Sequence, residues 1–302
     1  MKIWKNTSTL DNLVPELKNT VEEFDAEIAV IGSKPINLSL MPNLKAIFKC
    51  GVGTDNVPFD EAEKRNIEVI LPSKKTKEYI FEETANFTIF LVLRMIYRKL
   101  GSVENWDKKS REFLGYKKVL VLGQGNIGKL VSYKLRPLVN VLTYDPIDNK
   151  ESDLKDLISQ SDVITLHIPL NSKTKCFIDE RKLALMKNSA ILINTSRGEV
   201  VDEDALYQEM AKGRVFAAFD VFWNEPYNGI LKSFYPERFY MTPHIASNCR
   251  NFLEGLAITF GAGIGDKITI KSVEAIDAEQ ITLSPTEKLA IDEEQLHDVM
   301  IT

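Results

Sequence analysis

A repeated alternation of short apolar runs with polar, helix-favouring segments constrains the fold of this chain more than any other feature. Buried parallel strands joined by crossover helices produce this pattern, because helices cover both faces of the sheet. The runs are residues 28–32, 44–51 and 67–72 in a first region, and 118–122, 141–144, 163–167, 190–194, 216–219 and 239–242 in a second. The sequence therefore predicts an α/β protein with two doubly wound parallel sheets, rather than an all-α or all-β fold.

A polar, charged stretch over residues 101–116 separates the two alternations and predicts a domain boundary. We expect one domain over residues 1–100, with part of the C-terminal segment at about 262–302, and a second domain over residues 101–261. Helices are expected over residues 11–24, 58–66, 82–100, 129–135 and 248–261. In the acidic tail, residues 284–287 (Ser-Pro-Thr-Glu) resemble a capping box that opens a short helix.

The composition excludes several classes of function. The net charge of −5 disfavours a general nucleic-acid binder, which needs a basic face. The most apolar stretch, residues 87–97, is too short to cross a membrane and contains Arg94. The 3 cysteines form no C-x-x-C pair, which predicts reduced thiols and no metal site. The N-terminus shows no signal-peptide pattern, so we expect a cytoplasmic protein that binds neither nucleic acid nor membrane.

The run GQGNIG at residues 123–128 follows an expected strand and precedes an expected helix. In this context Gly123 permits a tight turn, Gly125 lets a pyrophosphate approach the backbone, and Gly128 lets the helix pack on the strand. The phosphates would meet free N–H groups at the positive end of the helix, at Asn126 and Ile127. The run therefore predicts a dinucleotide-binding loop.

Asp145 ends the next expected strand, at the spacing of the residue that binds the adenosine ribose in such loops. A carboxylate at this position accepts hydrogen bonds from the ribose hydroxyls and repels a 2′-phosphate. The sequence therefore predicts NAD as the cofactor rather than NADP.

The chain holds 3 histidines, and imidazole is suited to proton transfer near neutral pH. His297 lies in the acidic tail and is expected on a surface helix. His167 ends an expected strand and is expected to be structural or to line the cofactor cleft. His244 comes just after a strand end, where parallel sheets bind ligands, and it is our candidate acid/base residue.

Arg197 and Glu225 lie at comparable strand ends. Each alone is typical of a surface charge. Together with His244 they supply the three groups that oxidation of a hydroxy acid needs. An arginine can hold a carboxylate through two hydrogen bonds, and a carboxylate beside an imidazole orients it and favours its charged form.

Six motifs in order make the chain resemble the D-isomer-specific 2-hydroxyacid dehydrogenases, which include phosphoglycerate, glycerate and D-lactate dehydrogenases. The motifs are GVGTDN, GQGNIG, LHIPL, LINTSRGEVVDEDAL, DVFWNEP and TPHIAS, within residues 49–247. The resemblance implies that the second region is a Rossmann NAD-binding domain and that the first, with the C-terminal end, is a flavodoxin-like substrate domain. It also implies a homodimer formed through the dinucleotide domain.

The resemblance implies a role for individual residues as well. Arg197 would bind the carboxylate and keto oxygen of a 2-keto acid, His244 would be the acid/base group, and Glu225 would pair with it. Pro169, Thr174, Thr195 and Asp220 would border the cofactor, together with Gly123, Gly125, Asn126, Ile127, Gly128 and Asp145. Lys49, Val52 and Gly53 would contact the substrate.

The physiological substrate and one other class of function stay open. Lys49 lies where phosphoglycerate dehydrogenases place a cation, so the substrate could carry a phosphate that Lys49 binds. Equally, Lys49 could be an ordinary surface lysine, and the substrate would then carry no phosphate. A corepressor-like protein that senses NAD(H) with little turnover would share the fold. Formate oxidation is a third alternative, although formate enzymes carry a glutamine where Glu225 stands.

Overall fold

The computed structural model describes residues 2–264, which form parts of two compact units. Of the described residues, unit 1 contains 2–82 and 249–264, and unit 2 contains 83–248. The sequence places these boundaries near residues 100 and 261 instead. The difference arises because helix α2 (Lys74–Ile96) runs through the boundary: Ile80 packs in a core of unit 1, whereas Leu91 packs in a core of unit 2. His297 and the capping box at residues 284–287 lie outside the described residues.

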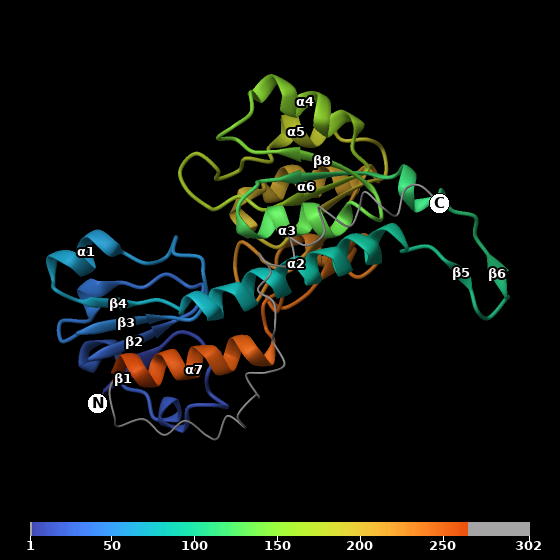
Figure 1. Ribbon diagram of the computed structural model, residues 1–302. Coiled ribbons are helices and arrows are strands. Elements are labelled where there is room, and N and C mark those ends of the chain that lie inside the picture. Colours follow the sequence, from blue (N-terminus) through green and yellow to red (C-terminus); the bar gives the residue numbers. More distant parts are fainter. Residues whose placement is uncertain (1, 265–302) are drawn as a thin grey trace, which may run out of the picture. The chain divides into compact units, whose positions relative to one another are not determined.

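Unit 1 is built on a four-stranded parallel sheet. Its strands are β1 (Ile3–Lys5), β2 (Ile28–Ile31), β3 (Ala46–Lys49) and β4 (Glu68–Ile70), in the order β1-β2-β3-β4. Val30 and Phe48 face helix α7 (Arg250–Ile264), where Phe48 meets Phe260 edge to face at 4.9 Å. Ile47 faces the opposite core, which also holds Ala62 of helix α1 (Phe59–Lys64). Figure 1 shows α7 lying along this sheet.

Unit 1 confirms the α/β class but differs from the expected flavodoxin-like order. Within residues 2–264, strands that follow one another in sequence are neighbours in this sheet. The described strands therefore show no reversal of order, which a doubly wound sheet requires. The expected helix over residues 11–24 is replaced by the 3-10 turns η1 (Pro15–Lys18) and η2 (Glu23–Asp25). Pro15 has no N–H to donate, so a helix cannot run through it.

Unit 2 is built on a six-stranded parallel sheet. The strands β7 (Lys118–Leu122), β8 (Asn140–Tyr144), β9 (Val163–Leu166), β10 (Ala190–Asn194), β11 (Val215–Phe219) and β12 (Phe239–Met241) are ordered β12-β11-β10-β9-β7-β8. The strand order reverses at β7, which confirms the doubly wound sheet predicted for this region. Ligands bind doubly wound sheets at the carboxyl ends of the strands beside such a reversal.

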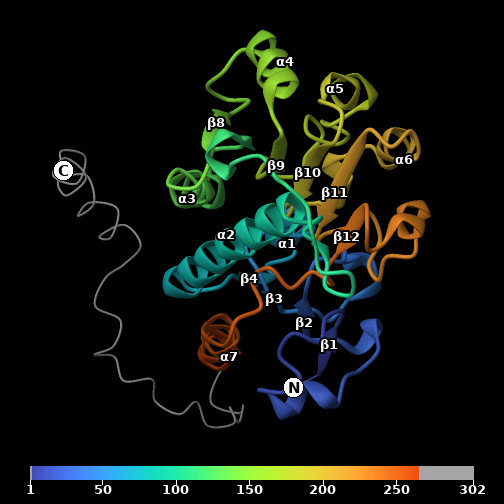
Figure 2. The same cartoon turned by 90° about the vertical axis from the view of Figure 1, so that its right-hand side faces the viewer.

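Helices cover both faces of the unit 2 sheet (Figure 2). Helices α4 (Glu151–Gln160), α5 (Glu180–Leu185) and α6 (Glu203–Ala211) contribute to the core on one face. Helices α2 and α3 (Asn126–Leu135) contribute to the core on the other. Along β7, Leu120 packs with the first group and Val119 with the second, because successive side chains of a strand point to opposite faces.

The stretch expected to separate the domains is instead an elaboration of unit 2. It forms a hairpin of two short antiparallel strands, β5 (Gly101–Ser102) and β6 (Asp107–Lys108), followed by a 3-10 turn, η4 (Leu114–Tyr116). Across residues 2–264, no helix combines the length and the apolar character that crossing a lipid bilayer requires.

Candidate active site

The glycine-rich loop joins β7 to α3 at the point where the strand order reverses. Gly123 has φ +99°, which favours glycine, and a side chain there would overlap the backbone carbonyl of His167. A side chain at Gly128 would overlap the carbonyl oxygen of Gly123. At Gly125, by contrast, a Cβ would have no atom of the described chain within 4 Å. The loop therefore leaves space where a pyrophosphate would approach, and the first N–H groups of α3, at Asn126 and Ile127, have no acceptor within the helix.

Asp145 lies beside this loop at the end of β8. Its Oδ2 accepts a hydrogen bond from the Gln124 N–H at 2.7 Å, and its Oδ1 accepts one from the Ile147 N–H at 2.9 Å. The two backbone bonds fix the carboxylate next to the glycine loop, as binding of a ribose requires.

Pro169 and Thr174 form a closed turn after β9. The Thr174 hydroxyl donates to the Pro169 carbonyl at 2.6 Å and accepts from the Asn171 N–H at 2.8 Å. Thr174 is buried, so these bonds shape the backbone of the turn. A contact of either residue with the cofactor stays a prediction.

His167 follows β9 directly behind the glycine loop. Its Nε2 lies 3.0 Å from the Thr165 hydroxyl, and burial lowers the pKa of the ring from 6.5 to about 3. The imidazole is therefore neutral at physiological pH and does not take up a second proton there, so it is unsuited to acid/base catalysis. This matches the structural role expected for it.

The low pKa of His167 predicts a pH-dependent stability. Below pH 6.5 the unfolded chain binds a proton at this ring and the folded chain does not, so the free energy of unfolding should fall as pH decreases, by up to about 1.4 kcal/mol per pH unit. In His167→Asn this contribution should disappear. Urea unfolding of both proteins between pH 5 and 7 measures it, and equal pH slopes would contradict the prediction.

Three strands end side by side at the carboxyl edge of the sheet. In the register of the sheet, Asn194 of β10 pairs with Phe219 of β11, which pairs with Met241 of β12. Arg197, Asp220 and His244 follow these strand ends within three residues. The parallel register therefore brings side chains that are distant in sequence to one edge.

His244 and Glu225 form a hydrogen-bonded pair. The imidazole Nδ1 lies 3.0 Å from Glu225 Oε1 and 2.9 Å from Oε2. Oε1 also accepts the Phe222 N–H at 3.2 Å, which orients the carboxylate. Both side chains are partly exposed, and the imidazole Nε2 has no hydrogen-bond partner within residues 2–264. The pair therefore presents Nε2 for exchange of a proton with a ligand.

Arg197 is brought toward this pair by a close approach of two loops. A Cβ on Gly198 would overlap the backbone of Phe222 and Trp223, so only glycine allows the loop after β10 to lie against the loop that carries Glu225. The guanidinium of Arg197 is partly buried, and its Nη1 donates to the Ser196 carbonyl at 2.7 Å. In the sequence, the glycine that follows Arg197 was the sign that another part of the backbone packs closely here.

Asp220 and Thr195, the residues expected to border the nicotinamide, bind other parts of unit 2. The carboxylate of Asp220 is buried, which raises its pKa against the opposing effect of hydrogen bonds from Thr242, Ile245 and Ala246. The Thr195 hydroxyl lies 2.9 Å from the hydroxyl of Thr88 on α2. Neither set of contacts could be foreseen from the sequence, because the partners lie far away along the chain.

The expected substrate residues belong to unit 1 and follow β3. The ammonium of Lys49 is buried and donates to the carbonyl oxygen of Gly32. Val52 is half-buried and packs against the core that contains Phe48, and Gly53 is half-buried. Their roles toward a substrate stay predictions.

A glycine loop with open space at Gly125 and a carboxylate held beside it, at the carboxyl edge of a doubly wound sheet, is the arrangement typical of dinucleotide-binding domains. The family model for the NAD binding domain of D-isomer specific 2-hydroxyacid dehydrogenases matches residues 92–246. The chain belongs to this family and is an NAD-dependent enzyme.

Several named proteins are similar to this chain. The chain is 33% identical to a hydroxypyruvate reductase of Thermotoga maritima, over 68% of this chain and 72% of that protein. It is 32% identical to a glyoxylate reductase of Thermococcus litoralis, over 85% and 84%. Among solved structures, a D-lactate dehydrogenase from Aquifex aeolicus complexed with NAD and lactic acid has a TM-score of 0.70 and 27% identity, over 87% of this chain and 94% of that one.

Proposed function

We propose that this enzyme transfers a hydride between NAD(H) and the α carbon of a small, unphosphorylated D-2-hydroxy acid. The observation that carries the proposal is the His244–Glu225 pair at the edge of the sheet where β10, β11 and β12 end. Such a pair supplies the proton transfer that interconversion of a hydroxyl and a carbonyl requires.

The side chains at this edge have distinct roles in the proposed reduction. NADH, when bound, supplies the hydride to the carbonyl carbon. The guanidinium of Arg197 holds the substrate carboxylate and stabilises the negative charge that develops on the carbonyl oxygen. His244 donates a proton to that oxygen from Nε2, while the hydrogen bond from Nδ1 to Glu225 orients the ring. The role of the backbone at Val52 and Gly53 in gripping the substrate rests on the family resemblance.

The burial of Lys49 supports an unphosphorylated substrate. Its ammonium is 2% exposed and already bonded to the Gly32 carbonyl, whereas a phosphate requires an accessible cation. Two relatives are named as reductases of small, unphosphorylated keto acids, hydroxypyruvate and glyoxylate.

A panel of keto acids tests the proposal. Glyoxylate, hydroxypyruvate, pyruvate and phosphohydroxypyruvate are each mixed with NADH and then NADPH, and the loss of reduced-nicotinamide absorbance is followed. We expect turnover with NADH and one of the first three acids. Tight NADH binding without turnover of any acid would instead support a sensing protein.

Asp145 is expected to set the preference for NADH. Replacing Asp145 with Ser removes the charge that repels a 2′-phosphate, so the ratio of kcat/KM with NADPH to kcat/KM with NADH should rise about tenfold or more. Glu151→Ser, a change of an exposed carboxylate at the start of α4, is the control. An unchanged ratio in Asp145→Ser would contradict this role.

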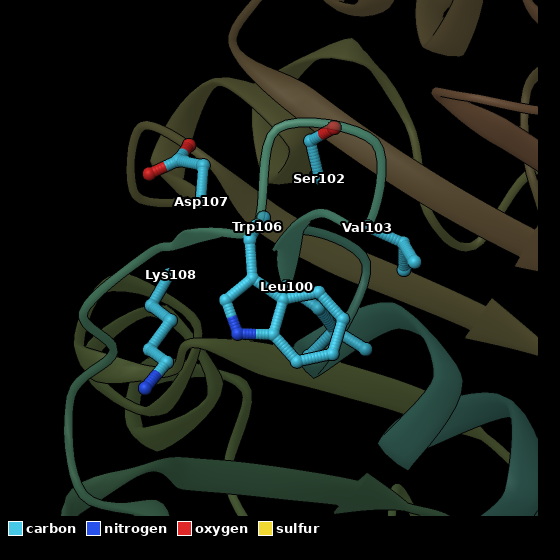
Figure 3. A pocket seen from close by; sticks show the side chains of 7 residues that line it. Leu100, Ser102, Val103, Trp106, Asp107 and Lys108 are labelled. Carbon is cyan, nitrogen blue, oxygen red and sulfur yellow. The ribbon is translucent and has the colours of Figure 1, made fainter.

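We also propose that two copies associate through the β5–β6 hairpin. Trp106 and Val103 are 77% and 83% exposed, and with Leu100 they line a shallow pocket at the hairpin (Figure 3). Strands of two residues are not stable alone in water, so this apolar surface requires a cover. The hairpin also carries Glu104 and Lys108, and charges of both signs allow a twofold-related copy to pair with it.

The association is tested by light scattering after gel filtration. The wild-type chain should elute as a dimer, and Trp106→Glu should shift it toward the monomer at micromolar concentration. Phe24→Glu changes another exposed aromatic residue, in unit 1, and should leave the dimer intact. A monomeric wild-type protein would contradict the proposal. The cytoplasmic location stays a prediction.

A further inference from the structure

The backbone at His244 adopts a conformation that the residue does not favour by itself. Its φ is +53°, in the left-handed region, where a residue with a Cβ persists only if its surroundings hold it. Pro243 precedes it and has no N–H to donate. The His244 N–H bonds only locally, to the Thr242 carbonyl at 3.0 Å. The conformation that aims the imidazole must therefore be fixed by neighbours on either side.

The carboxylate of Asp220 supplies these neighbouring contacts. Its Oδ1 accepts from the Thr242 hydroxyl at 2.6 Å and from the Ile245 N–H at 2.9 Å. Its Oδ2 accepts from the Ala246 N–H at 2.9 Å. The three bonds therefore hold the backbone on both sides of His244, because one donor residue precedes it in the sequence and two follow it.

We propose that Asp220 is a positioning residue, whose carboxylate clamps the loop on both sides of His244 and so holds the imidazole against Glu225. This inference rests on the proposed function, in which that imidazole moves the proton. The family resemblance implies a place for Asp220 beside the nicotinamide. The side chain is, however, only 1% exposed, and both of its oxygens are already bonded within unit 2.

The substitution Asp220→Asn tests the clamp. The amide keeps the size of the side chain, but its NH₂ group then faces the Ala246 N–H, so one bond is replaced by a donor-to-donor contact. We expect kcat for keto-acid reduction to fall about 100-fold because the imidazole is misplaced. The Kd for NADH, measured by fluorescence, should stay within about twofold of the wild-type value.

A matched control separates positioning from general loss of structure. Asp179 also accepts a backbone N–H, from Lys182 at 2.9 Å, where it caps α5. Asp179→Asn removes the charge that pairs with Lys182 but keeps an oxygen that accepts this N–H, so it should leave kcat unchanged. If Asp220→Asn does not fold, Thr242→Val removes a single bond of the clamp and should lower kcat about fivefold.

A measurement without turnover makes the inference independent of the substrate. The NMR signal of the His244 Cε1–H group, assigned with His244→Gln, should move in Asp220→Asn in the same direction as in Glu225→Gln, and should stay in place in Asp179→Asn. An unmoved signal overturns the clamp, as does a weakened Kd for NADH with an unchanged kcat at saturating NADH. If the wild-type chain reduces no keto acid, the proposed function fails. The shift of the His244 Cε1–H signal in Asp220→Asn would still test whether Asp220 positions the imidazole.

Discussion

Replacing His244 with Gln is expected to lower kcat for keto-acid reduction about 10³-fold, within the range that general acid–base catalysis contributes. Glutamine is close to the imidazole in size and can still bond to Glu225, but it cannot release a proton to the carbonyl oxygen. The loss should therefore appear in the chemical step. Steady-state rates at saturating NADH and keto acid measure it.

The binding of NADH provides the control for His244→Gln. The glycine loop and Asp145 lie at other strands of the sheet, so the Kd for NADH should stay within about twofold of the wild-type value. Glu225→Gln keeps the imidazole and should cause a smaller loss, because only the orientation of the ring is affected. A rate near that of the wild type in His244→Gln would remove the histidine from the mechanism.

Replacing Arg197 with Ala is expected to lower kcat/KM by a factor of about 10²–10⁴, because two charge-assisted hydrogen bonds to the substrate correspond to about 3–6 kcal/mol. Arg197→Lys keeps the charge but loses the two-pronged geometry, so an intermediate loss is expected. Initial rates over a range of keto-acid concentrations separate the effects on KM and kcat.

An exposed arginine serves as the control for this substitution. Arg181→Ala, on α5, removes the same charge from the surface of unit 2 and should leave kcat/KM unchanged. If Arg197→Ala and Arg181→Ala had equal kinetic constants, Arg197 would not bind the substrate.

The sequence predicted the strands of unit 2 well because most of them are continuous apolar runs. Residues 118–122 and 190–194 were predicted with the bounds that β7 and β10 have. Strand β1 was missed, because only two apolar residues, Ile3 and Trp4, stand between Lys2 and Lys5. Helix α2 begins at Lys74, earlier than predicted, because Ser73 accepts the Thr76 N–H and caps the helix.

The candidate site could be predicted as a set of residues but not as a set of contacts. Motif order placed His244 and Glu225 at strand ends, and the structure pairs them. The bonds of Asp220 could not be foreseen, because they depend on how the ends of β11 and β12 align. The burial of Lys49 was equally hidden, since its partner is a backbone carbonyl at the end of another strand, β2.

Among the described strands, β12 lies at the edge of its sheet and pairs with β11 alone, over three residues. Hydrogen bonds at such a margin open more readily than those at the centre, without unfolding of the remainder. The loop that carries His244 follows directly after this edge strand. Mild heat or denaturant should therefore abolish activity at conditions where the circular dichroism spectrum is still that of the native protein. Amide hydrogen exchange should also be faster in β12 than in β10.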